Sequence, residues 1–229
     1  RVHSEYSLAD GLVRVKELVS EVRNQGMPAV AISDINNLFA LVKLYQTTLE
    51  QGIKPIVACD VLVEDLNKDG KPSALVLVAQ SVVGYQGLSR LLSKAYTDGQ
   101  ASGKPTLSRD WIVQESSDLI ALSAALDGDI GKAIAAGNLK DAVRRTACWQ
   151  EVFPERFYIE LQRTGASGEE DYVSSALDVA RETSCPVVAT NNVRFLHKAQ
   201  FDAHEVRVCI HEGRTADDPR REKRYTEEQ

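Results

Sequence analysis

Residues 56 to 63 read Ile-Val-Ala-Cys-Asp-Val-Leu-Val, an apolar and β-branched run with the length of a buried strand. A helical stretch separates it from an earlier run of the same kind, Ala29–Ser33. Further predicted strands are Leu75–Ala79, Leu119–Ser123, Phe157–Leu161 and Val187–Thr190, with a first strand around Val2. The chain is therefore predicted to be an α/β protein with about seven strands.

Amphipathic stretches lie between these runs. In the first of them, apolar residues from Leu12 to Val22 keep helical spacing after Asp10, a predicted cap, and Gly26-Met27-Pro28 ends the helix. Further helices are predicted at Leu38–Gln51, Gly84–Tyr96, Leu139–Val152, Tyr172–Thr183 and Phe201–Cys209. Single helices between strands favour parallel crossovers, in a closed barrel or in an open doubly wound sheet. No Gly-x-Gly-x-x-Gly or Walker-type loop follows a strand, so we prefer the barrel.

Composition excludes several classes of protein. The net charge of −6 is the opposite of the basic footprint of a nucleic-acid-binding protein, so strong DNA binding is not expected. No apolar run has the length of a membrane span, and the N-terminus has no signal-peptide pattern. The four cysteines are scattered, which predicts reduced and mostly buried thiols. These features favour a cytoplasmic protein without a membrane partner.

Two segments stand out as connections. Residues 67–72, Asn-Lys-Asp-Gly-Lys-Pro, are typical of a hairpin-like turn. After Gly213 the chain becomes charged and is interrupted by a proline, which predicts a domain at residues 1–213 and the start of a linker at residues 214–229. We interpret the chain as part of a longer protein.

Polar residues follow the predicted strands, where α/β barrels carry their sites. His3 and Asp10 follow the first strand, Asp34 the second and Asp60 the third, while Asn191, Asn192 and Arg194 follow the last. A histidine and carboxylates at strand ends could bind a metal ion. The alternative is that the aspartates cap helices and form ion pairs.

Five ordered motifs resemble the PHP domain (polymerase and histidinol phosphatase) of bacterial DNA polymerase III alpha subunits, in the proteobacterial form. They are Arg-Val-His-Ser-Glu-Tyr-Ser (1–7), Ala-Ile-Ser-Asp (31–34), Gly-Ile-Lys-Pro-Ile-Val-Ala-Cys-Asp (52–60), Gly-Tyr-Gln-Gly-Leu (84–88) and Val-Ala-Thr-Asn-Asn-Val-Arg-Phe (188–195). The resemblance extends to Asp202-Ala203-His204-Glu205 and to Tyr225. It implies a distorted seven-stranded (β/α)7 barrel of PHP type.

Active members of this family carry nine ligands for up to three metal ions. The positions that match these ligands are Arg1, His3, Asp10, Ile35, Asp60, Ala74, Ala125, Asn192 and Arg194. Only His3, Asp10 and Asp60 keep a side chain that could bind a metal, and the family arrangement leaves at most two of them at any one metal. A catalytic zinc needs three protein ligands and a water, so we expect neither a bound metal nor catalytic residues.

The resemblance implies a structural and interaction role in DNA replication. The expected partners are the polymerase body of the same chain and the proofreading exonuclease. The parent protein would be a DNA-directed DNA polymerase whose magnesium ions lie in a polymerase active site outside these residues. The alternative is a metal-dependent phosphoesterase or 3′–5′ exonuclease.

Two of the replaced ligands are arginines. We expect Arg194 near Asp60 or Asp34, and Arg1 near Asp10 or Asp60, because the remaining carboxylates need compensating charge. His197, His204 and His211 are predicted to pack on a helix face or to face solvent, since their spacing does not suit a ligand pair. Trp111 and Trp149 are predicted to anchor the core, and Glu169-Glu170-Asp171 to open a helix.

Overall fold

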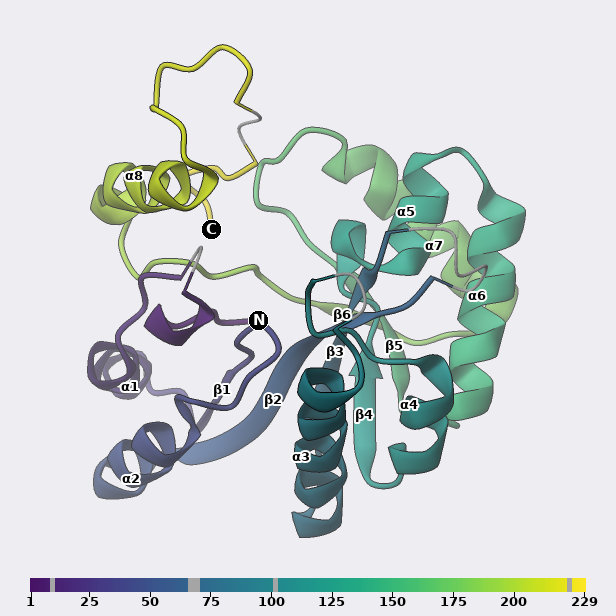
Figure 1. Ribbon diagram of the computed structural model, residues 1–229, viewed down its shortest axis with the longest axis horizontal. Helices are drawn as coiled ribbons and strands as arrows, with labels where there is room; N and C mark the ends of the chain where they lie inside the picture. The colour runs from purple at the N-terminus through teal and green to yellow at the C-terminus, as the bar shows by residue number, and fades with distance from the viewer. Residues whose placement is uncertain (9–10, 66–70, 101–102, 222–223) are drawn as a thin grey trace. The chain divides into compact units, whose positions relative to one another are not determined.

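The computed structural model describes residues 1–8, 11–65, 71–100, 103–221 and 224–229 (Figure 1). The chain forms two compact units. The first unit contains residues 1–56, 163–167 and 191–229, and the second contains residues 57–162 and 168–190.

The strands form one mixed sheet whose order follows the chain, from β1 to β6. Their bounds are β1 (Ala29–Ile32), β2 (Lys54–Val63), β3 (Ser73–Ala79), β4 (Leu119–Leu122), β5 (Phe157–Leu161) and β6 (Val187–Ala189). β2 pairs with β3 and β3 with β4 in antiparallel register, whereas β4–β5 and β5–β6 are parallel. The predicted strands are confirmed from the second one onward.

The expectation of parallel crossovers throughout is wrong for β2, β3 and β4. The segment between Val63 and Ser73 is too short for a crossover helix, so the chain returns as a hairpin and the two strands run antiparallel. The turn predicted at residues 67–72 falls largely on residues 66–70, outside the described residues. β3 and β4 are antiparallel although the helices Val82–Thr97 and Arg109–Glu115 lie between them, and the parallel pairs are β4–β5 and β5–β6.

The predicted first strand around Val2 is not a strand among the described residues. Val2 forms a single bridge with Val193, and the His3 amide donates to the Val193 carbonyl over 2.9 Å. The 3-10 helix η1 (Glu5–Ser7) starts immediately afterwards, with Ser4 Oγ accepting from the Tyr6 amide over 3.1 Å. Ser4 forms a second isolated bridge, with Val13, so this segment makes single bridges and no continuous strand. The described residues form six strands instead of the predicted seven.

In the first unit, α1 (Val15–Asn24) and α2 (Leu41–Gln51) pack against each other, and α8 (Phe201–Glu212) follows the short 3-10 helix η3 (Lys198–Gln200). Figure 1 shows α1 and α2 side by side. The core of this unit includes Val13, Val15, Leu18, Val19, Val22, Val30, Ile32, Ala40, Leu44 and Ile53. The N-cap of α1 is Arg14, so the helix begins later than predicted. Asp10, its predicted cap, lies outside the described residues.

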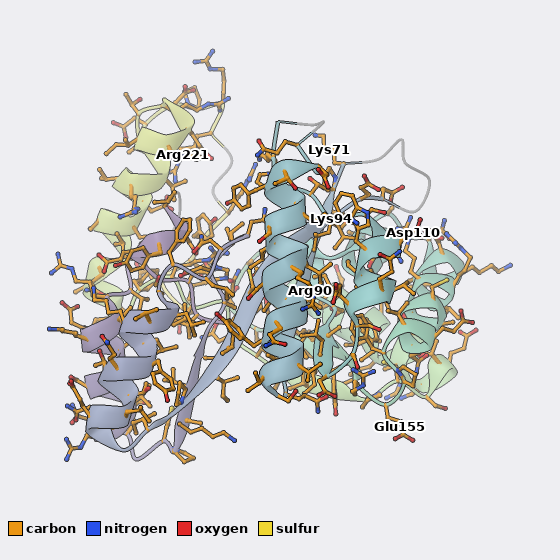
Figure 2. All side chains as sticks on the ribbon, turned by 60° about the horizontal axis from the view of Figure 1, so that its bottom comes forward. Lys71, Arg90, Lys94, Asp110, Glu155 and Arg221 are labelled. Atoms are coloured by element: carbon orange, nitrogen blue, oxygen red, sulfur yellow. The ribbon has the colours of Figure 1, made fainter. Side chains whose placement is uncertain are left out.

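The second unit surrounds its strands with helices. These are α3 (Val82–Thr97), α4 (Arg109–Glu115), η2 (Ala125–Asp127), α5 (Asp129–Ala135), α6 (Leu139–Val152) and α7 (Glu169–Thr183). Figure 2 shows Arg90 and Lys94 along α3. Arg90 pairs with Glu115 at 2.6 Å and Lys94 Nζ lies 4.5 Å from the Trp111 ring centre, so both residues connect α3 to α4.

The segment after α8 packs back onto that helix. α8 ends at Gly213, which adopts a left-handed conformation with φ of 64°. Arg221, labelled in Figure 2, pairs with Glu205 of α8 at 2.6 Å, and the Tyr225 ring meets the His204 ring edge-on at 4.7 Å between centres. The helix begins at the predicted residue and continues three residues beyond the predicted end at Cys209. The domain boundary proposed after Gly213 stays a prediction.

None of the helices in the described part of the chain combines the length and the apolarity that a membrane crossing requires.

Candidate functional site

The N-terminal segment positions His3. The bridge between Val2 and Val193 holds this segment beside the stretch that follows β6, and the His3 side chain is fully buried. The Ser7 hydroxyl lies 3.5 Å from His3 Nδ1. His3 is therefore fixed in the interior of the first unit.

Asp34 follows β1 and is also buried, but its oxygens are used by neighbouring donors. It accepts hydrogen bonds from the Ser4 amide over 2.7 Å, the Ser4 hydroxyl over 2.6 Å and the Ser7 hydroxyl over 2.7 Å. Both carboxylate oxygens participate. Asp34 thus holds η1 against the end of β1.

Asn192 and Arg194 flank the bridged Val193 and are both buried. Burial lowers the pKa of His3 well below its usual value, and the nearby positive charges of Arg194 and Arg1 lower this pKa further. A side-chain hydrogen bond with Asn192 opposes this shift. The guanidinium carbon of Arg194 lies 5.5 Å from the centre of the Tyr225 ring. We call His3, Asn192, Arg194 and Arg1 the His3 site.

The structure therefore brings together four of the nine predicted positions. Ile35 directly follows Asp34, and its amide donates to the Ser7 hydroxyl over 3.4 Å. Asp10 lies outside the described residues.

The other three positions belong to the second unit. Asp60 is buried in β2 opposite Val76, Ala74 lies in β3 and forms a bridge with Gly128, and Ala125 opens η2 with φ of 48°. The methyl groups of the two alanines offer no atom to a metal.

Across the residues that the structure describes, no group of three or more histidine, cysteine or carboxylate side chains is placed to hold a metal ion. Arginines supply the charge that acts on His3. The predicted pairing of Arg194 and Arg1 with particular aspartates stays a prediction.

A second buried polar group lies in the second unit, and the sequence analysis missed it. Arg145 of α6 contacts Asp65 at 3.0 Å, Asp141 at 2.6 Å and Asp129 at 3.6 Å, and Asp129 also pairs with Arg109. We call these five residues the Arg145 cluster. Burial alone would lower the pKa of Arg145, but its hydrogen bonds to Asp141 and Asp65 outweigh this effect and raise it. The spacing of Asp141 and Arg145, four residues apart on a helix, is the signal that could have revealed the pair.

Trp149 completes this region. Its ring is buried, its Nε1 donates to Asp129 over 3.2 Å, and the guanidinium carbon of Arg109 lies 4.1 Å from the ring centre. The predicted core role of Trp149 is confirmed, whereas Trp111 is only partly buried.

The remaining histidines and the cysteines lie in the surroundings that the sequence predicts. His204 packs between the Phe195 and Tyr225 rings, while His197 and His211 are exposed, as predicted. None of the four cysteines, all within the described residues, forms a disulfide, and three of them are buried. Burial raises the pKa of the Cys185 thiol to about 11. Glu169 opens α7 as predicted.

Comparisons with known proteins agree with this fold. The family model of the PHP domain matches residues 1–164. The chain is 46% identical over all 229 residues to the DNA polymerase III subunit alpha of Pseudomonas aeruginosa, and 44% identical over 230 residues to that of Escherichia coli. In both comparisons the whole chain is covered, and it spans 20% of the length of the relative.

Two solved structures share the fold at low identity. One is described as a metal-dependent phosphoesterase from Bifidobacterium adolescentis, with a TM-score of 0.55 and 11% identity over 85% of this chain and 86% of that one. The other is an amidohydrolase from Chromobacterium violaceum, with a TM-score of 0.51 and 12% identity over 90% of this chain and 95% of that one. At this identity the likeness concerns the fold alone.

Proposed function

This chain belongs to the PHP domains of the bacterial DNA polymerase III alpha subunits, and from that premise we propose that it is a metal-free structural and docking module. It matches the part of those relatives that carries the PHP domain, so it belongs with a polymerase body. We also propose that the full protein is a DNA-directed DNA polymerase of the cytoplasmic replication machinery. Its magnesium would then be bound outside these residues.

The observation that carries the metal-free role is the charge around His3. A positive group that is close enough to lower the pKa of an imidazole also repels a divalent cation at that imidazole. Arg194 is buried, so solvent screens its charge weakly. A zinc ion would therefore meet a repulsive field at the one imidazole that remains among the nine positions.

Three of the other positions, and Asp34 beside one of them, support the same proposal. Asp34 already accepts three hydrogen bonds, so coordination would require it to give up donors that hold η1. Ala74, Ala125 and Ile35 have no donor atom in their side chains. We propose that the arginines replace the metal ions as the positive charge of a degenerate site, within an α/β domain of PHP type.

We further propose that the docking partner is the proofreading exonuclease of the replication machinery. A metal-free module should bind it equally well with and without a chelator. The test is co-elution of this chain with the purified exonuclease at tens of micromolar, in the presence of EDTA and then with added zinc. Failure to co-elute under both conditions would contradict the docking role.

A metal-dependent phosphoesterase or exonuclease is the competing function. We expect hydrolysis of phosphodiester substrates to stay at background with added zinc or manganese. If a metal-dependent rate appeared and vanished in Asp60→Asn, this competing function would replace our proposal.

A further inference from the structure

Helix α2 carries an apolar stripe on its outer side. Phe39, Val42, Tyr45 and Leu49 are each between 52% and 69% exposed. Their spacing of three, three and four residues places them along one side of the helix and of the residue that precedes its cap. We call these four residues the α2 stripe.

The inner side of α2 contributes fewer buried residues to the core than the inner side of α1. Within the helix, Leu44 and Thr48 are the buried residues. The neighbouring helix α1 has the usual arrangement, with Val15, Leu18 and Val19 buried and polar residues outside. A helix side that faces water is normally polar, as in α1. The apolar outer side of α2 therefore has the composition of a surface that another part of a protein covers.

The positive charge near the stripe is directed elsewhere, and the one acidic residue of α2, the exposed Glu50, directly follows the last residue of the stripe. Lys43, the one lysine of α2, pairs with Glu5 at 3.3 Å, and its amine lies 5.7 Å from the Tyr6 ring centre. Contacts between proteins that must find each other by diffusion usually carry charges that steer the encounter, whereas permanent contacts are more apolar. The α2 stripe has the composition of a permanent contact.

The size of the stripe distinguishes between possible occupants. An aromatic side chain contributes roughly 150–250 Å² and Val and Leu contribute less, so the four side chains, exposed by half to two thirds, present on the order of 400 Å². A stable contact between separate proteins needs about 800 Å² on each partner, whereas contacts between domains of one chain begin at about 600 Å² in total. The stripe is too small for a stable dimer of this chain and sufficient for a contact within one polypeptide.

The relatives contain such a polypeptide, because this chain spans only a fifth of their length. We propose that the α2 stripe packs against the part of the full-length alpha subunit that lies outside these 229 residues. Covalent connection raises the effective concentration of the two surfaces, so a contact of this size can stay closed. The inference rests on the proposed role of this chain as a module of the polymerase.

Hydroxyl-radical footprinting of the full-length alpha subunit and of this chain alone tests the proposal. Phe39 and Tyr45 should be oxidised at least about five-fold more slowly in the full-length subunit, because buried side chains are shielded from the radical. Tyr85 and Tyr96 of α3, which are 40% and 45% exposed, provide the reference for each sample. Equal rates for Phe39 and Tyr45 in both samples, relative to that reference, would overturn the proposal.

Substitutions make the test specific. Val42→Asp combined with Tyr45→Asp in the full-length subunit should raise the Phe39 rate to that of this chain alone, because charges disrupt an apolar contact. The matched control is Val82→Asp with Val83→Asp, two exposed apolar residues of α3, which should leave the Phe39 rate unchanged. A Phe39 rate that the α2 substitutions do not change would count against the proposal.

If the exonuclease or a second copy of this chain covered the α2 stripe, footprinting would give a different pattern of protection. Protection that appears only after the exonuclease is added, or only as the concentration of this chain rises, would assign the stripe to that partner or to a second copy and overturn the proposal. Protection in the full-length subunit together with failed co-elution of the exonuclease would reject the docking role and leave the α2 inference standing.

Discussion

The Arg145 cluster and the His3 site are both buried and charged, but they arrange their charges in opposite ways. In the Arg145 cluster each arginine contacts at least one carboxylate, and Arg145 itself contacts three. In the His3 site two arginines act on an imidazole and lower its pKa. The first arrangement neutralises charge, whereas the second places positive charge where active family members are expected to hold metal ions.

By this difference, the Arg145 cluster is a structural network of ion pairs, whereas the His3 site is a site at which arginines stand in ligand positions. A cluster in which every charge has an opposite partner stabilises a fold as long as its members remain, because removal of a shared member leaves others buried without a partner. In our proposal, the arginines of the His3 site take the place of metal ions as the positive charge of the site. The two regions should therefore respond differently to substitution, pH and metal ions.

The largest effect is expected for Arg145→Ala. It removes the shared partner of Asp65, Asp129 and Asp141, so the free energy of unfolding should fall by about 3–5 kcal/mol. Urea denaturation followed by circular dichroism measures this change. The matched control is Arg144→Ala on the same helix, which also loses a contact with Asp141 but is half exposed and should cost less than about 1 kcal/mol. Similar costs for the two variants would show that the Arg145 cluster is not a cooperative network.

A smaller effect is expected for Arg194→Ala, at about 1–4 kcal/mol, if its guanidinium compensates buried carboxylates. The loss should be partly recovered when the facing aspartate, Asp34 or Asp60, is also changed to Asn. Arg181→Ala is the control, because that arginine is exposed and pairs with Asp178 on the surface of its own helix. A cost no greater than that of the control would contradict the role assigned to Arg194.

The pH dependence gives the third prediction. The pKa of His3 is lowered in the folded state, so below the ordinary value of about 6.5 the unfolded chain takes up a proton that the folded chain does not. Stability from this group is present above that pH and is lost as the pH falls, by at most about 1.4 kcal/mol per pH unit. His3→Gln should flatten the curve between about pH 6.5 and 5, as measured by urea denaturation across that range.

His197→Gln is the control for this experiment, since it replaces an exposed imidazole in the same unit and should keep the slope of the original chain. A slope that His3→Gln does not change would mean that His3 is protonated in the folded state or accessible to solvent.

The sequence was sufficient for most of the fold. β5 and α6 were predicted with the bounds that the structure has, because a short aromatic and apolar run and a long amphipathic run are clear local signals. α4 and α5 were missed because helices of seven residues span only about two turns and show little periodicity. The strand predicted around Val2 does not form, because Ser4 caps the 3-10 helix that begins at Glu5.

The site was less predictable than the fold. The motifs identified the positions, and the bridge between Val2 and Val193 explains why His3, Asn192 and Arg194 meet. The sequence did not reveal that Ser4 and Ser7 occupy the oxygens of Asp34, since such contacts depend on how the N-terminal turn closes. The Arg145 cluster was missed because Asp65 and Asp129 join it from distant parts of the chain.

The most direct test of the metal-free role is metal analysis of the purified chain, with titration calorimetry against zinc and manganese. Our account predicts no stoichiometric metal after purification and no binding at micromolar concentration, because positive charge surrounds His3 and a catalytic zinc needs three protein ligands. Arg194→His, which adds an imidazole and removes a charge, should bind zinc more tightly than the original chain. Stoichiometric zinc or manganese in the original chain, lost in His3→Ala, would contradict the account.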